Sequence, residues 1–362
     1  MAKNQNWKND LKEAFRSSTD LYQFLGWDPG VAARVEKTYP LFIPVMLAEK
    51  IKAQGPSGVL AREFLPHQDE LNPQGLEDPI GDLEHYKAPQ LIHRYASRAL
   101  FTPTSICPVH CRYCFRKNEL NADNELFSAD FEKTLSYLRD HPEISEIIFT
   151  GGDPLTLSTE KLKKYIMAFS ELKSITDLRI HSRYPVILPG RIDEDLKNLL
   201  REATQKFRTV SLAVHANHVT EFGEDSMEAI TGLHQTGVQL LSQTVLLKGV
   251  NDSASELLDL INLFITLKVR PYYLHHPDQV KGGIHFYLSL EEGRKIYSKL
   301  RTKLPGWALP QYIIDIPGGA GKVSAFNPES TAFGGQLMGL SGEFVSVQEP
   351  LISVPGTHPE HT

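Results

Sequence analysis

The chain has 362 residues, with 38 Lys and Arg against 44 Asp and Glu, and a formal charge of −6. Its hydrophobic share of 41% supports a normal core and excludes a chain that is disordered throughout. The slight acidity argues against nucleic-acid binding, and no apolar run approaches the roughly 18 residues of a membrane span. The start, MAKNQNWKND, shows no apolar signal segment, so we expect a cytoplasmic protein.

Three parts are predicted along the chain. Residues 1–92 read as a helical and irregular extension, with an amphipathic segment near Asn9 and a stretch rich in Pro, Gly, Asp and Glu from Gln54 to Tyr86. Residues 93–305 have a regular rhythm of strands and helices. Residues 306–362 form a C-terminal segment that ends in a flexible, Pro-containing tail from Phe333 onward.

The central part contains six apolar, β-branched runs of strand length, each followed by a stretch with helical spacing. The runs are Ala99–Thr104, Glu146–Thr150, Asp177–His181, Thr209–Val214, Val238–Val245 and Val269–Leu274. Six such units predict a parallel sheet with right-handed crossovers, either open and doubly wound or curved into a partial barrel. In both arrangements the carboxyl ends of the strands meet at one edge, where we expect the functional residues.

All three cysteines, Cys107, Cys111 and Cys114, follow the first predicted strand. An odd and tightly clustered set excludes a disulfide framework. Zinc would need a fourth ligand such as His110, whereas an iron–sulfur cube on three thiolates keeps one iron open to a small chelating molecule. The spacing CxxxCxxC favours the cube over zinc and over three inert buried thiols.

Other polar or glycine-rich positions follow the later strands. In chain order they are Gly151-Gly152-Asp153, Ser182-Arg183, His215 with Asn217, Gln243 and Asp278. Two glycines let the backbone approach a ligand closely and offer it their N–H groups. An arginine presents a planar fork of donors that suits a carboxylate. His215 and Asn217 serve the same ligand or are satisfied polar groups at a strand end.

These motifs resemble those of the lysine 2,3-aminomutase family of radical S-adenosylmethionine enzymes, including the aromatic Tyr113 just before the last cysteine. The resembling segments are Ile92–Tyr95 with Arg98, Cys107–Lys117, Thr150–Leu155, His181–Val186, Gln243–Asp252, Arg270–His275 with Asp278, and Asp315–Lys322. The resemblance implies a partial (βα)6 TIM-like barrel of the radical S-adenosylmethionine type. It also implies that the enzyme is an isomerase of the lysine 2,3-aminomutase type.

The resemblance implies three cofactors. Cys107, Cys111 and Cys114 would hold a [4Fe–4S] cluster whose open iron binds S-adenosylmethionine. Gly151, Gly152 and Asp153 would bind the amino end of that molecule, Ser182 and Arg183 its carboxylate, and His215 the same ligand. Arg94, Tyr95 and Arg98 resemble a pocket for pyridoxal phosphate, with Gln243 and Tyr272 or Tyr273 as further contacts.

Lys322 ends a glycine-rich stretch that invites comparison with a phosphate-binding P-loop. The comparison fails, because Val323 stands where Ser or Thr would bind Mg²⁺. Pyridoxal phosphate enzymes need a lysine that forms a Schiff base, and the family places that lysine here. We therefore expect Lys322 to be the catalytic, cofactor-bearing lysine.

The expected substrate is L-lysine, whose α-amino group moves to the β-carbon to give β-lysine. Arg116 suits the substrate α-carboxylate, and Asp278 with Asp315 suits the ε-ammonium, because a cation between two carboxylates relieves their repulsion. A low-potential electron donor such as flavodoxin or ferredoxin and a homo-oligomeric state are further expectations.

The alternatives concern biological context and class. Longer family members carry zinc-binding cysteines, whereas this chain has Ser253 at one such position and none in its tail. This zinc-less form resembles the branch that supplies β-lysine to elongation factor P, while the loop ending at Lys322 resembles the free-lysine enzyme. An aminomutase for another amino acid, such as glutamate or arginine, is a second alternative. A non-enzymatic iron–sulfur sensor or carrier is the third.

Overall fold

One curved sheet organises the molecule. The computed structural model describes residues 7–120, 130–317, 319, 321–326, 336–338 and 344–346. Ten strands pair in sequence order without closing, and the seven from β3 to β9 are parallel. The strands are β1 (Tyr86–Ala88), β2 (Leu91–Tyr95), β3 (Arg98–Phe101), β4 (Glu146–Phe149), β5 (Asp177–Ser182), β6 (Thr209–His215), β7 (Gln239–Val245), β8 (Arg270–His275), β9 (Gln311–Ile316) and β10 (Gly321–Ser324).

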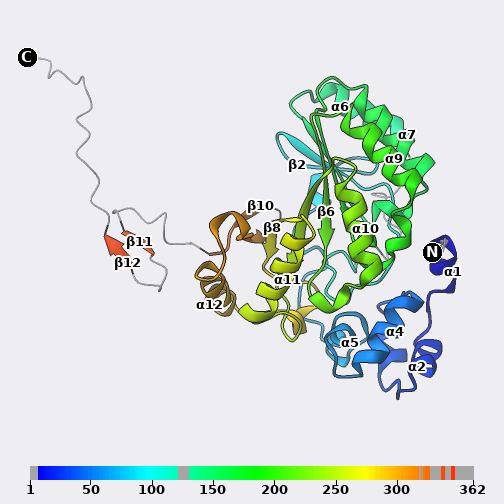
Figure 1. Cartoon of the computed structure of the whole chain (residues 1–362), viewed down its shortest axis with the longest axis vertical. Coiled ribbons are helices and arrows are strands. Elements are labelled where there is room, and N and C mark those ends of the chain that lie inside the picture. Colours follow the sequence, from blue (N-terminus) through cyan, green and yellow to red (C-terminus); the bar gives the residue numbers. More distant parts are fainter. Residues whose placement is uncertain are drawn as a thin grey trace, which may run out of the picture.

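A helix follows each parallel strand from β3 to β8 and packs on the outer face of the sheet (Figure 1). These helices are α6 (Phe131–Asp140), α7 (Thr159–Ser170), α9 (Glu194–Thr204), α10 (Glu224–His234), α11 (Ala254–Thr266) and α12 (Leu290–Arg301). The short α8 (Tyr184–Ile187) comes directly after β5. The prediction of a partial (βα)6 barrel is confirmed, and all six predicted strands exist within a few residues of their expected bounds.

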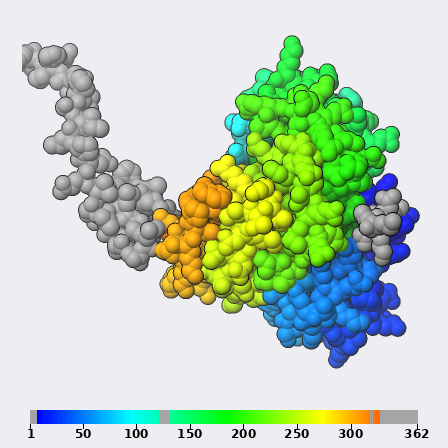
Figure 2. Space-filling model, viewed as in Figure 1, coloured from blue at the N-terminus to red at the C-terminus, as the bar shows by residue number. Residues whose placement is uncertain are grey.

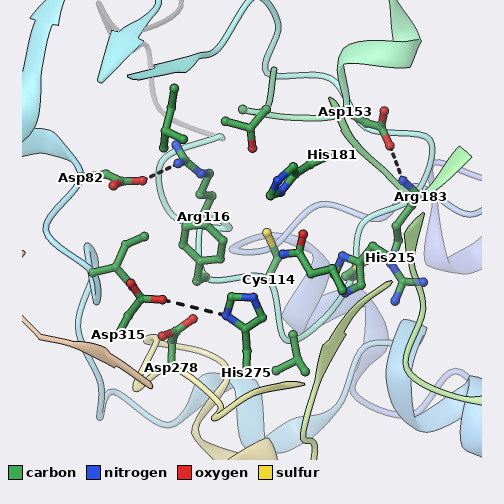
Figure 3. Close-up of a pocket in the computed structure, with 18 of the residues that line it drawn as sticks. Asp82, Cys114, Arg116, Asp153, His181, Arg183, His215, His275, Asp278 and Asp315 are labelled. Carbon is green, nitrogen blue, oxygen red and sulfur yellow. Dashed lines mark hydrogen bonds and ion pairs between the residues drawn. The ribbon is translucent and has the colours of Figure 1, made fainter. Parts of the chain in front are cut away.

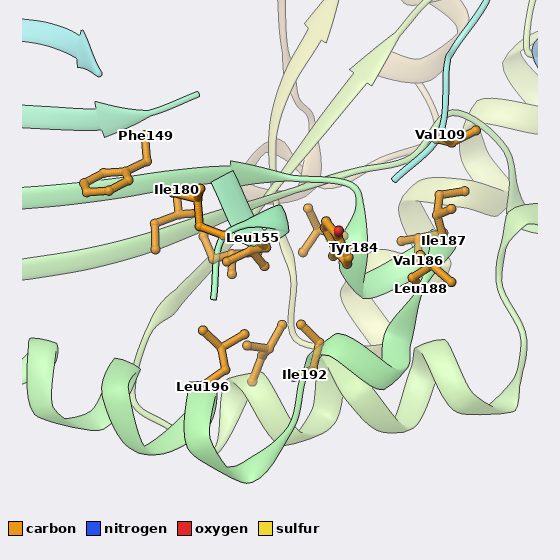
Figure 4. Close-up of a cluster of buried hydrophobic side chains, with 14 of the residues drawn as sticks. Val109, Phe149, Leu155, Ile180, Tyr184, Val186, Ile187, Leu188, Ile192 and Leu196 are labelled. Atoms are coloured by element: carbon orange, nitrogen blue, oxygen red, sulfur yellow. The ribbon is translucent and has the colours of Figure 1, made fainter. Parts of the chain in front are cut away.

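Local sequence explains the outer helices. Ser158, Asp193, Ser253 and Ser289 each accept a hydrogen bond from the first turn of the helix that they precede, and so begin α7, α9, α11 and α12. Apolar residues at helical spacing, such as Leu196, then face the sheet, where they pack with side chains of the strands (Figure 4). This core holds the barrel wall rigid behind the strand ends.

The strands missed by the sequence analysis lie at the two edges of the sheet. β1 and β2 extend it antiparallel to β3, β9 adds a seventh parallel strand, and β10 returns antiparallel to β9. Each is short, and β1, β2 and β9 come from parts of the chain that the sequence places in terminal extensions. The division at residues 92 and 305 remains a prediction, but the sheet itself runs from Tyr86 to Ser324.

The N-terminal residues cover the end of the barrel where the parallel strands finish. Their helices pack below α10 and α11 in Figures 1 and 2 and contact the loops after β5 and β6. They are α1 (Trp7–Glu13), α2 (Ser18–Leu25), α3 (Ala32–Glu36), α4 (Val45–Gln54) and α5 (Val59–Phe64), followed by the 3₁₀ turns Gln68–Leu71 and Leu83–His85.

The C-terminal part is described only in pieces. A two-stranded sheet pairs β11 (Gln336–Met338) with β12 (Phe344–Ser346). Most of the tail predicted from Phe333 onward, and Gly318 and Ala320 of the glycine-rich stretch, lie outside the described residues. None of the helices in the described ranges is both long and apolar enough to span a bilayer.

Candidate active site

One cavity at the carboxyl ends of the strands collects the site residues that the sequence analysis singled out by motif, with the exception of Asn217. The lining includes Cys107, Cys111, Cys114, Gly151, Gly152, Asp153, Ser182, Arg183, His215, Gln243, Asp278, Asp315, Lys322, Arg94, Tyr95, Arg98 and Arg116. Residues from β2 through β10 thus converge, although more than 200 positions separate the first from the last. The roles of these residues remain predictions, and their shared location is a finding.

The three cysteines lie on the loop after β3 as free, half-buried thiols. Burial raises the pKa of each, and that of Cys111 reaches about 12, so the thiolates need a positive partner. No trio of Cys, His, Asp or Glu in the described ranges is arranged around a point where one metal ion would sit. The three thiols lie within eight residues of one another on one loop, where the sequence analysis expects a cluster.

Gly151 and Gly152 bring the loop after β4 against the cysteine loop. A Cβ on Gly152 would lie 2.5 Å from the Ile106 carbonyl oxygen, and Gly151 has a φ of +105°. One expectation needs correction here: the Gly152 N–H donates to the Thr104 oxygen at 2.8 Å, and the Asp153 N–H donates to Ile106. The N–H group of Gly152 is therefore bound by the cysteine loop and is not open to a ligand.

Asp153 organises the strand end beside this turn. Its buried carboxylate accepts from the Ser182 hydroxyl at 2.9 Å and from the Arg183 backbone N–H at 2.7 Å. It also accepts from the Leu155 N–H, which begins the short helix Pro154–Thr156. Burial raises the pKa of Asp153 to about 6. Ser182 thus donates to the protein itself rather than to an open space.

Arg183 lies in the cavity wall, where Figure 3 shows its contact with Asp153, and two further buried carboxyl groups bind its guanidinium. Its Nη2 donates to Glu63 of α5 at 2.6 Å and also to the Tyr113 hydroxyl, and its Nη1 donates to Glu221 at 2.5 Å. The expected fork for a carboxylate ligand is therefore taken by Glu63 and Glu221. Its Nε is buried without a hydrogen-bond partner, and the role expected for Arg183 toward a ligand carboxylate stays a prediction.

His215 and Asn217 have different surroundings in the structure. His215 lines the cavity, and its Nε2 lies 3.1 Å from the Tyr113 hydroxyl. Burial and the Arg183 charge lower its pKa well below the usual value, so the ring is neutral. Asn217 is fully buried and is satisfied by protein groups, including Glu63 at 2.9 Å. Of the two readings left open for Asn217, the satisfied polar group is the one observed.

The opposite end of the cavity carries Lys322 and the two aspartates. Antiparallel pairing of β10 with β9 sets Lys322 directly across from Asp315, and the Lys322 Nζ lies 2.8 Å from the Asp315 Oδ1. The Lys322 N–H also donates to the Tyr95 hydroxyl at 2.8 Å. Asp315, expected to read a substrate ammonium, thus binds the ammonium of Lys322.

Asp278 faces the same space without a partner in the portion of the chain that is described (Figure 3). Burial and the neighbouring charge of Asp315 raise its pKa to about 7, although Lys322 acts in the opposite direction. His275 lies beside both aspartates, with its Nδ1 4.0 Å from the Asp315 Oδ2, and its buried Nε2 accepts and donates no hydrogen bond. Burial lowers the pKa of His275 to about 4, so this ring is neutral as well.

A buried aspartate joins two of the predicted arginines. The Asp82 carboxylate accepts from Arg94 at 2.6 Å and from the Arg116 Nη2, and Arg94 also lies 3.7 Å from Asp315. Arg116 is therefore not an unpaired cation, as a carboxylate site would suggest. Its Nε and Nη1 atoms still lack hydrogen-bond partners although they are buried, and Glu119 forms an ion pair with Nη1 at 3.5 Å.

Arg98 differs from its neighbours because no ion pair to a carboxylate is found for it within the described ranges. Its guanidinium lies 4.0 Å from the centre of the Tyr95 ring. Tyr272 and Tyr273 stack with ring centres 3.8 Å apart, and both line the cavity with Gln243. This region combines an arginine without a carboxylate partner and flat aromatic faces, a set that suits a planar phosphorylated molecule.

Sequence reasoning missed several residues of the site: Glu63, Asp82, Arg179, His181, Glu221 and His275. Arg179 and His181 had a usable signal, because they alternate within the otherwise apolar β5 and so share its inner face. Glu63 and Asp82 had none. Both come from the N-terminal extension, and only the fold brings them to the strand ends.

Comparison with known proteins places residues 101–261 in the radical SAM superfamily. The L-lysine 2,3-aminomutase of Escherichia coli is 34% identical over 320 residues, which cover 87% of this chain and 92% of that protein. The L-lysine 2,3-aminomutase of Haemophilus influenzae is 33% identical and covers 87% and 94%. That of Clostridium subterminale is 32% identical and covers 88% and 77%.

A solved structure of TsrM, a radical S-adenosylmethionine methyltransferase from Kitasatospora setae, also matches part of the chain. The match has a TM-score of 0.36 and 13% identity, and covers 59% of this chain and 41% of that one. It is too distant to support any conclusion beyond those drawn above.

Proposed function

We propose that this chain, which belongs to the lysine 2,3-aminomutase family of radical S-adenosylmethionine enzymes, moves the α-amino group of L-lysine to its β-carbon. The chain is an isomerase, and the family to which it belongs uses a [4Fe–4S] cluster, S-adenosylmethionine and pyridoxal phosphate. The substrate, the product β-lysine and the assignment of individual residues are the parts that we propose. The observation that carries them is the shared cavity, with cysteines at one end and, at the other, Lys322 paired with Asp315 beside Asp278, which has no partner among the described residues.

The residues present fit the three cofactors. Cys107, Cys111 and Cys114 offer soft thiolates on one loop, and their raised pKa values indicate a site that needs metal charge. Carbonyl oxygens of the turn at Gly151 and Gly152 suit the amino group of S-adenosylmethionine, since an ammonium donates hydrogen bonds. Ser182 and Arg183 act behind this turn, where they hold Asp153 and the cysteine loop in place.

Pyridoxal phosphate would be held by Lys322, with Arg98, Tyr95 and Gln243 around it. Arg94 is held by Asp82 and contributes positive charge to the same region. When bound, the cluster with S-adenosylmethionine supplies a carbon-centred radical that removes a hydrogen atom, and pyridoxal phosphate supplies an aldehyde that carries the migrating nitrogen. All other steps fall to residues of this chain.

Those residues bind and orient the substrate. The Nε donor of Arg116, which is buried and has no hydrogen-bond partner among the described residues, takes one oxygen of the α-carboxylate next to the cysteine loop. Asp278 and Asp315 take the ε-ammonium at the other end, and the arriving cation lets Asp278 ionise. With both ends fixed, the β-carbon is turned toward the radical source. The N-terminal segment that carries Asp82 and Glu63 closes the site against water, which a carbon radical requires.

Incubation with several amino acids tests the proposal. The full-length protein, reconstituted anaerobically with iron and sulfide, receives dithionite, S-adenosylmethionine, pyridoxal phosphate and one of L-lysine, L-glutamate or L-arginine. We expect β-lysine and 5′-deoxyadenosine from L-lysine, and no β-amino acid from the other two. The Lys322→Ala variant, with its cluster absorbance intact, should give no β-lysine.

Two results would contradict the proposal in different ways. Failure to release 5′-deoxyadenosine with any amino acid would favour an iron–sulfur carrier. A β-amino acid from glutamate or arginine in preference to lysine would move the enzyme to another substrate. Whether the β-lysine serves free-lysine metabolism or the modification of elongation factor P stays a prediction from resemblance, as do the electron donor and the oligomeric state.

A further inference from the structure

The Asp315 carboxylate has more cations around it than a dedicated substrate site would have. It is almost fully buried, with 4% of its side chain exposed. The Lys322 Nζ lies 2.8 Å from its Oδ1, and the Arg94 Nη1 lies 3.7 Å from the same oxygen. The only nearby group on its Oδ2 side among the described ion pairs is the neutral His275. A substrate ammonium that approached Asp315 in this state would meet the charge of Lys322.

Asp278 differs from Asp315, because it has fewer cations around it. It lies beside Asp315, lacks an ion-pair or hydrogen-bond partner in the described segments, and shares the cavity with Lys322. With Lys322 present as an ammonium, the two aspartates and Lys322 carry two negative charges and one positive charge at most. One more cation balances the group only if it can approach both aspartates without repulsion from Lys322.

We propose that Lys322 and the substrate use the Asp315 carboxylate in turn, so that the ε-ammonium is bound only once Lys322 is engaged by pyridoxal phosphate. The inference rests on the proposed function and adds a role to Asp315. Before the cofactor is bound, Asp315 is the positioning residue of Lys322 and holds its amine inside the cavity. When pyridoxal phosphate binds, Lys322 would give up a proton to solvent and its amine would condense with the aldehyde with loss of water, so that its ammonium would leave the carboxylate and the substrate cation could take its place.

The backbone supports this exchange. Lys322 and Asp315 are direct cross-strand neighbours in the β9–β10 pair, so their side chains lie on one face of the sheet at fixed separation. The Tyr95 hydroxyl accepts the Lys322 backbone N–H at 2.8 Å and fixes this residue independently of its side chain. The Lys322 amine can therefore move from Asp315 to a cofactor while its backbone stays in place.

Calorimetry with 6-aminohexanoate tests the exchange without turnover. This probe keeps the ε-ammonium and the carboxylate of lysine but lacks the α-amino group whose migration defines the reaction. Full-length protein with its cluster, and without S-adenosylmethionine, is compared in three forms: wild type without pyridoxal phosphate, wild type loaded with it, and Lys322→Ala without it. We expect the last two forms to bind the probe at least about tenfold more tightly than the first.

Matched controls separate this result from indirect effects. Lys163→Ala removes an exposed lysine that pairs with Glu202 on the outer helices, and it should bind the probe as the cofactor-free wild type does. Norleucine, which lacks the ε-ammonium, should bind the two cofactor-free forms, wild type and Lys322→Ala, with equal affinity. Lys322→Arg keeps the positive charge and should bind the probe as weakly as the cofactor-free wild type.

Different failures point to different conclusions. Equal binding of 6-aminohexanoate by cofactor-free wild type and by Lys322→Ala would overturn the shared use of Asp315 and leave the proposed function standing. Probe binding that is no stronger than norleucine binding in every form would instead remove the lysine-reading role of Asp278 and Asp315, and with it the proposed substrate.

Discussion

The two ends of the cavity differ in how their buried charged groups are paired. Beside the cysteine loop, Arg183 is held by Glu63 and Glu221, and Asp153 is held by Ser182 and a backbone N–H. Near Lys322, Asp278 has no partner in the described segments, and the buried Nε2 of His275 makes no hydrogen bond. The first end is balanced by the protein alone, whereas the second reaches balance only with a further cation.

This difference indicates which charged groups fix the structure and which ones remain for a ligand to pair with. A charge satisfied by the fold contributes to stability and fixes geometry, and its loss should appear first in folding or in cluster assembly. A charge left without a partner costs stability in the free protein and contributes to binding. Substitutions at the two ends should therefore separate stability from substrate affinity.

The largest effect at the cysteine end is expected for Gly152→Ala. Its new Cβ would lie 2.5–2.7 Å from backbone atoms of Ser105 and Ile106, which must move and carry Cys107 with them. We expect cluster absorbance and 5′-deoxyadenosine formation to fall by at least about tenfold after reconstitution. Gly306→Ala is the control, because no atom lies within 4 Å of its Cβ position. An intact cluster in Gly152→Ala would show that the loop adapts.

The next effect is expected for Glu63→Ala, which removes the buried carboxyl group that accepts a hydrogen bond from the Arg183 Nη2. We expect the free energy of unfolding to fall by about 3–5 kcal/mol in chemical denaturation. Burial and Glu221 raise the pKa of Glu63 to about 8, so Glu63→Gln resembles the protonated native residue and should cost much less at pH 7. Removal of the exposed partner in the Lys163–Glu202 pair by Glu202→Ala should cost at most about 1 kcal/mol. Equal losses in the free energy of unfolding for Glu63→Ala and Glu202→Ala would show that the buried pair of Arg183 with Glu63 contributes no more to stability than an exposed pair.

Asp278→Asn should affect affinity more than stability. Because the pKa of Asp278 is raised to about 7, kcat/KM for lysine should fall as the pH drops below about 7, where the carboxyl takes up a proton. The Asn variant should lose this pH-dependent limb and raise KM by roughly tenfold or more. Asp259→Asn, on the exposed face of α11, should keep both the KM and the pH profile of the wild type.

The raised pKa of Asp278 changes stability with pH in the opposite direction from its effect on kcat/KM. The folded protein binds a proton on Asp278 that the unfolded chain releases near pH 4, so the contribution of this group to stability declines between about pH 4 and pH 7. Asp278→Asn should flatten that part of the stability curve in denaturation measured across this range. A wild-type curve that rises there, with no change in the variant, would argue against the unpaired carboxylate.

The smallest effect is expected for Ser182→Ala, which removes one neutral donor from Asp153. Asp153 keeps its two backbone N–H bonds, so we expect a loss of about 1–2 kcal/mol in unfolding and a cluster of normal absorbance. Ser255→Ala, exposed on α11, should change neither quantity. A loss as large as that of Glu63→Ala would mean that Ser182 supports more than one bond.

The sequence predicted the parts of the molecule that depend on local pattern. The six strand-and-helix units follow from alternating apolar runs and from caps such as Ser158, and the cysteine spacing pointed to a cluster site. The partners of the charged residues escaped prediction because they are long-range. The residues around Arg183 and Arg116 in the sequence give no indication of their partners, Glu63 and Asp82, which lie far away along the chain. Each arginine was therefore predicted to bind a ligand. Short edge strands such as β10 escaped for the same reason, since pairing partners define them.

The hairpin of β9 and β10 has a consequence for how this site can vary among related chains. Since side chains alternate between faces along a strand, one inserted or deleted residue within β10 ahead of Lys322 would turn its amine to the far side of the sheet. Changes of length in this hairpin are thus tolerated only outside the paired residues. We therefore expect related chains that keep both Asp315 and Lys322 to keep the interval of seven residues between them as well.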